Sequence, residues 1–319
     1  MSSLNTIILE RIRQPWTRTI WHVNHFEAVL GTGLEVRIRA SNRHQTLVAE
    51  AALLAEIDRL ELIFSRFLPQ SELNRFLNSS EMQVSPELLE VLSLAESWRQ
   101  RTRNAFHPGV DALSALWRSG SIPQAAQLMP ILRKLDGPLW TISGNLVQRT
   151  SFLPVNFNAF AKGWIVDRAC LVAAQLEGVW DVLVNIGGDL RHAGSSAQRV
   201  TIADPFSSID NAPAWCEVRI QNQAVASSGN SRRGFQIGTD WYSHVIDPRT
   251  GWPVQHTVAV GVIAPDAATA DALATAFCVL EVEDSLKLAD DLPETACLIV
   301  TEDRRVHTNK RWHQFSPSV

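Results

Sequence analysis

Two side chains that could bind a metal ion lie four residues apart in the stretch "PDAATADALATAFCVL". Asp271 and Thr275 would face the same side of a helix, because residues four apart are neighbours on a helix surface. Leu273 and Phe277 form the adjacent apolar stripe, so we expect the pair at the edge of a cleft. A carboxylate, a hydroxyl and a nearby backbone carbonyl suit a hard cation such as Mg²⁺. An ordinary helix with an acidic residue near its N-terminus is the alternative.

A candidate base lies in "YSHVIDPRTG", residues 242–251. Pro248 fixes φ and Gly251 permits a positive φ, so "DPRTG" is expected to form a turn, with His244 on the strand before it. A histidine titrates near neutral pH and is the usual general base of enzymes. A structural histidine held by a hydrogen bond is the alternative interpretation.

Two further stretches could approach a phosphate or another ligand. In "NIGGD", residues 185–189, two glycines follow an expected buried strand and would let the backbone come close to a ligand or another chain. A β-bulge is the alternative. In "NFNAFAKGWIVD", Lys162 lies near an expected helix start, where free backbone N–H groups favour anions. A solvated surface lysine is the alternative there.

The elements that would position these residues come in clusters of strands and clusters of helices. Apolar spacing predicts helices over residues 46–64, 85–102, 159–176 and 266–280, and alternating stretches predict strands between them. This pattern indicates an α+β fold with antiparallel sheets packed with helices. Because no linker divides the chain, we expect a loose arm at residues 1–24 and one compact, two-lobed unit at residues 25–319.

The composition excludes several classes of partner. A net charge of −4 does not provide the excess of positive charge that is typical of nucleic-acid-binding proteins. The four cysteines form neither a CxxC pair nor a Cys/His cluster, so we expect no zinc site and no redox pair. The N-terminus lacks the apolar core of a signal peptide, and no apolar stretch reaches membrane-spanning length. We therefore expect a cytoplasmic protein that is not embedded in a membrane.

The order of these stretches along the chain resembles that of the ApbE-type flavin transferase family, over roughly residues 27–300. The matching stretches are "LGTGLEVRI", "FSRFLPQSELNRFLN", "NAFHPGVDALSALW", "NFNAFAKGWIVD", "VLVNIGGDLRHAG", "VASSGN", "SHVIDPRTGWPV" and "ADALATAFCVL". The resemblance implies a T-fold-like architecture and a Mg²⁺-dependent FAD:protein FMN transferase. Such an enzyme splits the pyrophosphate of FAD and attaches FMN to a Ser or Thr hydroxyl of an acceptor flavoprotein, releasing AMP.

The resemblance also implies a role for each matching residue. Asp271 and Thr275, with the carbonyl of Ala159, would hold Mg²⁺, and His244 would be the base for the acceptor hydroxyl. The residues expected along FAD or around its flavin and adenosine pockets are Leu30, Phe67, Ala105, Phe106, His107, Asn156, Lys162 and Val245. The chain departs from the family where His107 and Asn156 replace acids and where Ala159 replaces glycine. We therefore expect less negative charge in the FAD cleft.

Two other functions fit the same residues. One is an FAD pyrophosphatase that releases FMN and AMP into water, because hydrolysis needs the same metal and pyrophosphate contacts. The other is a non-catalytic flavin-binding or assembly protein, which the replaced acids at His107 and Asn156 would favour. AMP release without an acceptor indicates the first, and FAD binding without turnover indicates the second.

Overall fold

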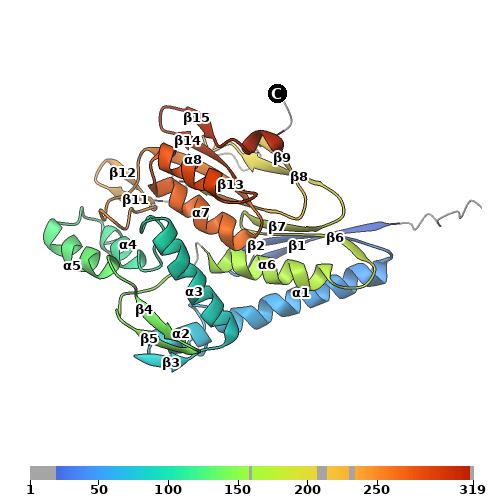
Figure 1. Cartoon of the computed structure of the whole chain (residues 1–319), viewed down its shortest axis with the longest axis horizontal. Helices are drawn as coiled ribbons and strands as arrows, with labels where there is room; N and C mark the ends of the chain where they lie inside the picture. Colours follow the sequence, from blue (N-terminus) through green and yellow to red (C-terminus); the bar gives the residue numbers. More distant parts are fainter. Residues whose placement is uncertain (1–18, 158–159, 207–213, 230–233, 317–319) are drawn as a thin grey trace, which may run out of the picture.

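An eight-stranded sheet forms the centre of the molecule (Figure 1). The computed structural model describes residues 19–157, 160–206, 214–229 and 234–316. In spatial order the strands are β1 (Ile20–Val29), β2 (Thr32–Ala40), β6 (Val179–Ile186), β7 (Asp189–Gly194), β10 (Ala224–Gly229), β13 (Thr257–Ala264), β14 (Ala296–Thr301) and β15 (Val306–Thr308). Each neighbouring pair is antiparallel, which confirms the predicted α+β class.

Alternation along the strands gives this sheet two apolar faces. On β6, Val182 and Val184 belong to the larger core, whereas Leu183 belongs to a smaller core on the opposite face. Helices α1 (Arg43–Phe64), α6 (Ala161–Ala174) and α7 (Ala267–Val279) cover the first face. The hairpin of β8 (Gln198–Ala203) and β9 (Ala214–Ile220) and the short helix η1 (Trp312–Gln314) cover the second. The sheet is therefore the middle of three layers.

A second group of elements lies beyond the helical face, at the lower left of Figure 1. It contains α2 (Glu72–Leu77), α3 (Pro86–Arg101), α4 (Asp111–Trp117), α5 (Ala125–Leu135) and a sheet in the order β3 (Glu81–Gln83), β5 (Leu146–Arg149), β4 (Trp140–Ser143). Helix α8 (Val282–Asp291) and the hairpin of β11 (Gly234–Ile237) and β12 (Asp240–Ser243) complete the described elements.

The four predicted helices are all present, with ends shifted by a few residues. Ser85 caps α3 as expected, since its hydroxyl accepts from the Leu88 N–H at 3.2 Å and Pro86 begins the helix. Strand β1 begins at Ile20, so the last residues of the expected arm, 20–24, pair with β2 in the sheet. Within the described part of the chain, no helix combines the length and apolarity needed to cross a membrane.

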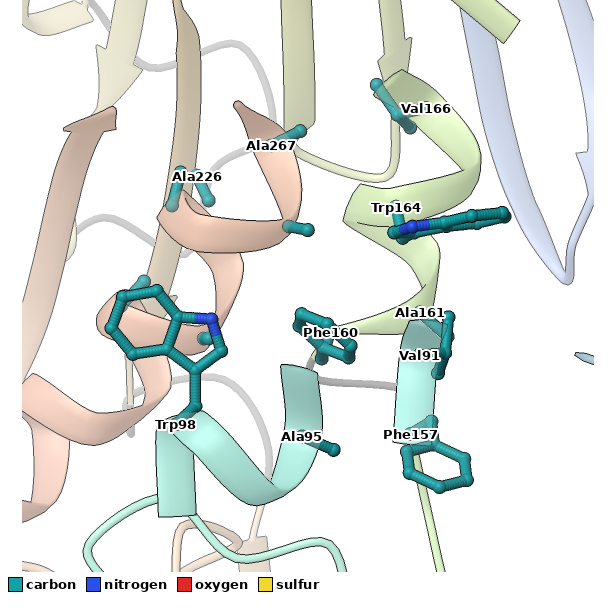
Figure 2. Packing of buried hydrophobic residues seen from close by; sticks show 14 of the residues in the cluster. Val91, Ala95, Trp98, Phe157, Phe160, Ala161, Trp164, Val166, Ala226 and Ala267 are labelled. Carbon is teal, nitrogen blue, oxygen red and sulfur yellow. The ribbon is translucent and has the colours of Figure 1, made fainter. Parts of the chain in front are cut away.

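Aromatic side chains fill the junction of α3, α6 and α7 (Figure 2). Trp98 comes from α3, Trp164 from α6, and Phe157 and Phe160 from the segment that leads into α6. Phe160 is completely buried. Because Phe160 is the residue before the first turn of α6, this packing fixes where the helix begins, and with it the position of Lys162.

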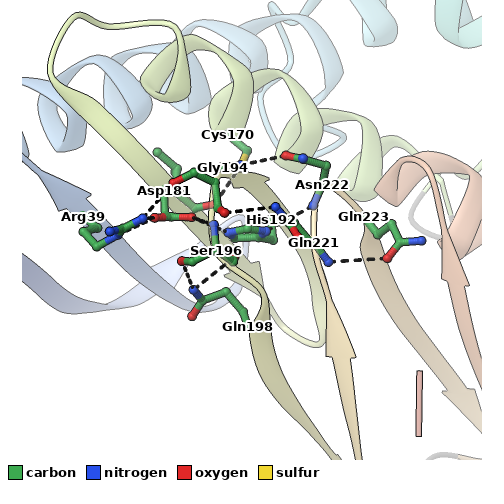
Figure 3. Close-up of polar contacts among 12 residues, drawn as sticks. Arg39, Cys170, Asp181, His192, Gly194, Ser196, Gln198, Gln221, Asn222 and Gln223 are labelled. Atoms are coloured by element: carbon green, nitrogen blue, oxygen red, sulfur yellow. Dashed lines mark hydrogen bonds and ion pairs between the residues drawn. The ribbon is translucent and has the colours of Figure 1, made fainter. Parts of the chain in front are cut away.

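A buried polar cluster holds the end of the β6–β7 hairpin that lies opposite its turn (Figure 3). The Asp181 carboxylate pairs with Arg39 and accepts from the Ser196 N–H at 2.8 Å. Nε2 of His192 lies 3.4 Å from Oδ1 of Asp181, and burial lowers the pKa of this histidine. The Asn222 N–H donates to Nδ1 of His192 at 3.3 Å. These contacts make the hairpin a fixed support for the residues at its turn.

Candidate active site

Helix α7 carries the predicted metal pair. It starts as predicted, because the Asp266 carboxylate accepts from the Thr269 N–H at 2.7 Å and caps the helix. Asp271 and Thr275 lie one turn apart. The expected position at a cleft edge is wrong for Asp271, which is only 8% exposed. Helix α7 packs against β10, β13 and α6, so nearly all of its residues are buried.

The two glycines of "NIGGD" form a two-residue hairpin turn between β6 and β7. Ile186 pairs directly with Asp189, and Gly187 and Gly188 have φ values of +59° and +100°. The β-bulge alternative is therefore wrong. A Cβ atom on Gly187 would lie 2.7 Å from Cγ2 of Thr32, so this turn also makes a close approach to the β1–β2 hairpin. The turn places Asp189 at the first position of β7.

A groove opens beside this turn. Its lining comes from β1, β2, the end of β6 and the β6–β7 turn and includes Phe26, Thr32, Asn185 and Gly188. The groove gives this end of the sheet an open surface next to the strand that begins with Asp189.

Lys162 pairs with Asp189 across α6 and β7. Their Nζ and Oδ2 atoms lie 2.7 Å apart, and the Asp189 side chain is 4% exposed. Lys162 is the second residue of α6, so its predicted position near a helix start is confirmed. The lysine is 27% exposed, and the alternative of a solvated surface lysine is wrong, because the ammonium is held by a buried carboxylate.

Asp271 lies in the field of this ion pair. Burial raises the pKa of Asp271 well above its usual range, the Asp189 carboxylate raises it further, and the Lys162 ammonium lowers it. Burial likewise raises the pKa of Asp189, and Lys162 opposes that shift. Oδ2 of Asp271 is buried and accepts no hydrogen bond from the described residues. The ionisation of Asp271 therefore depends on its burial and on the Lys162–Asp189 ion pair.

A third carboxylate fixes the start of α7. Asp167 of α6 accepts from the N–H groups of Ala267 at 2.8 Å and Ala268 at 3.0 Å. Burial raises the pKa of Asp167 to about 7. One turn earlier, a Cβ atom on Gly163 would lie 2.4 Å from the carbonyl oxygen of Ala267, so the two helices touch backbone to backbone. Helix α6 thus holds both Lys162 and the helix that carries Asp271.

His244 lies in a bend directly after β12 and is half-buried, so its predicted position on the strand is wrong by one residue. The predicted turn after it is confirmed, because the Gly251 N–H donates to the Asp247 carbonyl at 2.8 Å and Gly251 has a φ of +79°. The Arg249 guanidinium pairs with Asp247 and donates to the Val279 carbonyl at 3.3 Å. The segment of His244 is therefore tied to the C-terminal end of α7.

The other residues predicted around FAD differ in exposure. Phe67 is 90% exposed, and Leu30 is half-buried in the β1–β2 turn with a φ of +50°. Val245 is buried. Asn156 is half-buried, and its N–H donates to the Pro108 carbonyl at 2.8 Å. Ala159 lies outside the described residues.

Ala105, Phe106 and His107 all have buried side chains. Phe106 meets Phe160 edge to face, with ring centroids 6.2 Å apart. Nδ1 of His107 accepts from the Gly109 N–H at 3.0 Å, and burial lowers the pKa of His107 to about 4. His107 is therefore neutral at pH 7 and packs as part of the core.

Asp167 and Asp189 were missed as site residues in the sequence, although Asp167 ends one stretch that matched the family and Asp189 lies within another. No spacing rule connects them to α7, because Asp167 and Ala267 are 100 residues apart. Among the described residues, no three His, Cys, Asp or Glu side chains gather in a way that could hold a metal ion. The predicted metal set uses one carboxylate, from Asp271, together with hydroxyl and carbonyl oxygens.

The family model described as the ApbE family matches residues 30–299. A Vibrio cholerae FAD:protein FMN transferase is 32% identical over 274 residues, covering 79% of this chain and 80% of that protein. A Rhodobacter capsulatus FAD:protein FMN transferase is 30% identical over 295 residues and covers 86% of this chain, which spans only about half (54%) of that relative's length.

The fold gives the same relationship. The crystal structure of the ApbE protein from Thermotoga maritima superimposes with a TM-score of 0.81 at 25% identity, covering 94% of this chain and all (100%) of that one. The flavin transferase ApbE from Vibrio cholerae gives a TM-score of 0.78, also at 25% identity, and covers 93% of this chain. Sequence and structure agree across the whole stretch that carries Lys162, Asp189, His244 and Asp271, and the chain belongs to the ApbE family.

Proposed function

We propose that this protein is a Mg²⁺-dependent FAD:protein FMN transferase, which attaches FMN to a Ser or Thr hydroxyl of an acceptor flavoprotein and releases AMP. The observation that carries this proposal is the buried Oδ2 of Asp271, which accepts no hydrogen bond from the described residues, in a chain whose relatives bear that name. A desolvated carboxylate oxygen with no hydrogen-bond donor is costly unless a cation satisfies it.

The residues present fit Mg²⁺. Asp271 offers a carboxylate, Thr275 offers a hydroxyl one turn later, and Ala159 would add a backbone carbonyl, which are the hard oxygen ligands this ion prefers. When bound, Mg²⁺ would neutralise charge on the pyrophosphate oxygens. The raised pKa of Asp271 fits this role, since a carboxylate that is costly to ionise alone gains most from a cation.

The chain's own groups would supply positioning and proton transfer. His244 would accept the proton of the acceptor hydroxyl as its oxygen forms a bond to the phosphorus of the FMN half. The pyrophosphate P–O bond breaks, and AMP leaves with the electron pair. The exposed Phe67 ring and the Leu30 turn would contact FAD at the protein surface. The neutral His107 and Asn156 would add no negative charge near it.

The proposal is tested by incubating the protein with FAD, Mg²⁺ and purified candidate flavoprotein subunits. Intact-mass spectrometry should show acceptor carrying one FMN, and peptide mapping should place it on Ser or Thr. An acceptor with that residue changed to Ala is the matched control and should stay unmodified. AMP release that is equal with and without acceptor would show an FAD pyrophosphatase instead. FAD binding without AMP release would show a non-catalytic flavin-binding protein.

A further inference from the structure

Phe67 lies in a bend, residues 65–68, between helices α1 and α2, and its side chain is 90% exposed. The bend directly follows Phe64, the last residue of α1, whose side chain is buried in the core. A single exposed apolar side chain is ordinary on a protein surface. What distinguishes Phe67 is the set of hydrogen bonds that fix the backbone on both sides of it.

The Asn74 side chain of α2 supplies three of these hydrogen bonds. Its Nδ2 atom donates to the Leu68 carbonyl at 2.7 Å and to the Arg66 carbonyl at 3.1 Å. It also donates to the Ser65 carbonyl at 3.2 Å. An amide nitrogen carries two N–H donors, so the three carbonyls share them. One half-buried side chain therefore binds the backbone both before and after Phe67.

Further contacts fix the bend from within and from helix α4. The Ser65 hydroxyl accepts from the N–H groups of Phe67 and Leu68, each at 3.3 Å. Nη1 of Arg66 lies 3.2 Å from Oδ2 of Asp111 on α4. The protein alone therefore fixes the conformation of the bend, and the Phe67 ring projects from it into solvent.

We propose that Asn74 is a positioning residue, which holds Phe67 where its ring can stack on an aromatic ring of FAD. This inference rests on the proposed function, which supplies FAD as the ligand. An aromatic side chain offers its face to the flat rings of a nucleotide. Because the bend is formed before FAD arrives, binding does not have to order it, and less conformational entropy is lost.

FAD titrations followed by flavin fluorescence, in EDTA and without acceptor, test the two residues separately and together. Phe67→Ala should raise the Kd for FAD about tenfold, within the range of stacking contributions. Asn74→Ala should raise it about fivefold, because the ring loses its fixed position. The double variant should bind FAD as Phe67→Ala does. Asn78→Ala, at the exposed C-terminal end of α2, is the matched control and should leave the Kd unchanged.

The double variant separates positioning of Phe67 from a general structural role of Asn74. A general role would weaken FAD binding equally with and without the Phe67 ring. An unchanged Kd in Phe67→Ala, or a loss from Asn74→Ala that persists in the Phe67→Ala background, would overturn the proposal. Asn74→Asp keeps the size of the side chain but replaces the N–H donors with an acceptor. It should raise the Kd at least as much as Asn74→Ala, and wild-type affinity would contradict the role of these hydrogen bonds.

Hydrogen–deuterium exchange on the unmodified protein covers the case in which the Asn74 variants do not fold. Without FAD, the N–H groups of Phe67 and Leu68 should already exchange several-fold more slowly than in an unstructured peptide. Exchange at the unstructured rate would overturn a pre-formed bend. None of these measurements contains an acceptor or follows FMN transfer, so a failure of this inference and a failure of the proposed function are distinguished.

Discussion

The carboxylate of Asp167 accepts a hydrogen bond from the N–H of Ala267 at 2.8 Å, although the two residues are 100 positions apart in the chain. Gly163, one turn earlier on α6, allows this contact, because any side chain there would meet the Ala267 carbonyl. The N-terminal end of α7 is thus set by α6. The position of Asp271 relative to Lys162 follows from this one helix–helix contact.

Gly163→Ala should therefore destabilise the protein and weaken Mg²⁺ binding. The added Cβ would lie 2.4 Å from a backbone oxygen that cannot rotate away, so α7 must shift, at a cost of about 1–3 kcal/mol. Urea unfolding measures the loss. Gly137→Ala is the control, because its Cβ would meet nothing within 4 Å, and its stability should match the wild type or exceed it slightly. Equal stability of both variants would contradict the close contact.

Asp271→Asn should abolish Mg²⁺-dependent turnover and leave the metal-free fold at least as stable as the wild type. Burial and the Asp189 carboxylate make ionisation of Asp271 unfavourable in the folded state, and the neutral amide avoids this cost. The Tm without metal should stay equal or rise, and the increase in Tm caused by Mg²⁺ should disappear. Asp266→Asn keeps a good N-cap and should keep the Mg²⁺ response. A large fall in the metal-free Tm would show a structural role for Asp271.

Features of this site that depend on residues close together in the chain can be predicted from the sequence, whereas features that depend on residues far apart in the chain cannot. Ser85 and Asp266 cap the helices that follow them, and such local signals place α3 and α7 correctly. The burial of Asp271 was not predicted, because the spacing of residues along α7 does not reveal that β10, β13 and α6 enclose it. The ion pair between Lys162 and Asp189 depends on how β6 pairs with β7 and on how α6 packs against the sheet.

His107→Asn should flatten the pH dependence of stability between about pH 6.5 and pH 4. Burial lowers the pKa of His107 to about 4, so in this window the unfolded chain binds a proton that the folded protein does not. Wild-type stability should therefore fall as pH decreases through the window, by about 3 kcal/mol from this residue. Asn keeps an acceptor for the Gly109 N–H. Urea unfolding across the pH range measures the difference, and identical slopes would contradict a buried neutral histidine.

His244→Ala should reduce FMN transfer by about 10²–10⁴-fold, the usual contribution of a general base. FAD affinity should remain close to that of the wild type, because the base acts on the acceptor hydroxyl. Initial rates of acceptor modification and FAD titration followed by flavin fluorescence separate the two quantities. His313→Ala, at an exposed position in η1, should retain full activity. Loss of FAD binding with an unchanged rate at saturation would assign His244 to substrate binding.

The ratio of AMP released to FMN attached distinguishes an FMN transferase from an FAD pyrophosphatase. Wild-type protein, FAD, Mg²⁺ and an acceptor flavoprotein react in one vessel, and both products are quantified by chromatography and mass spectrometry at successive times. A transferase should release one AMP for each FMN on the acceptor, and Asp271→Asn should form neither product. AMP in excess of attached FMN, or no attached FMN with any acceptor, would contradict this function.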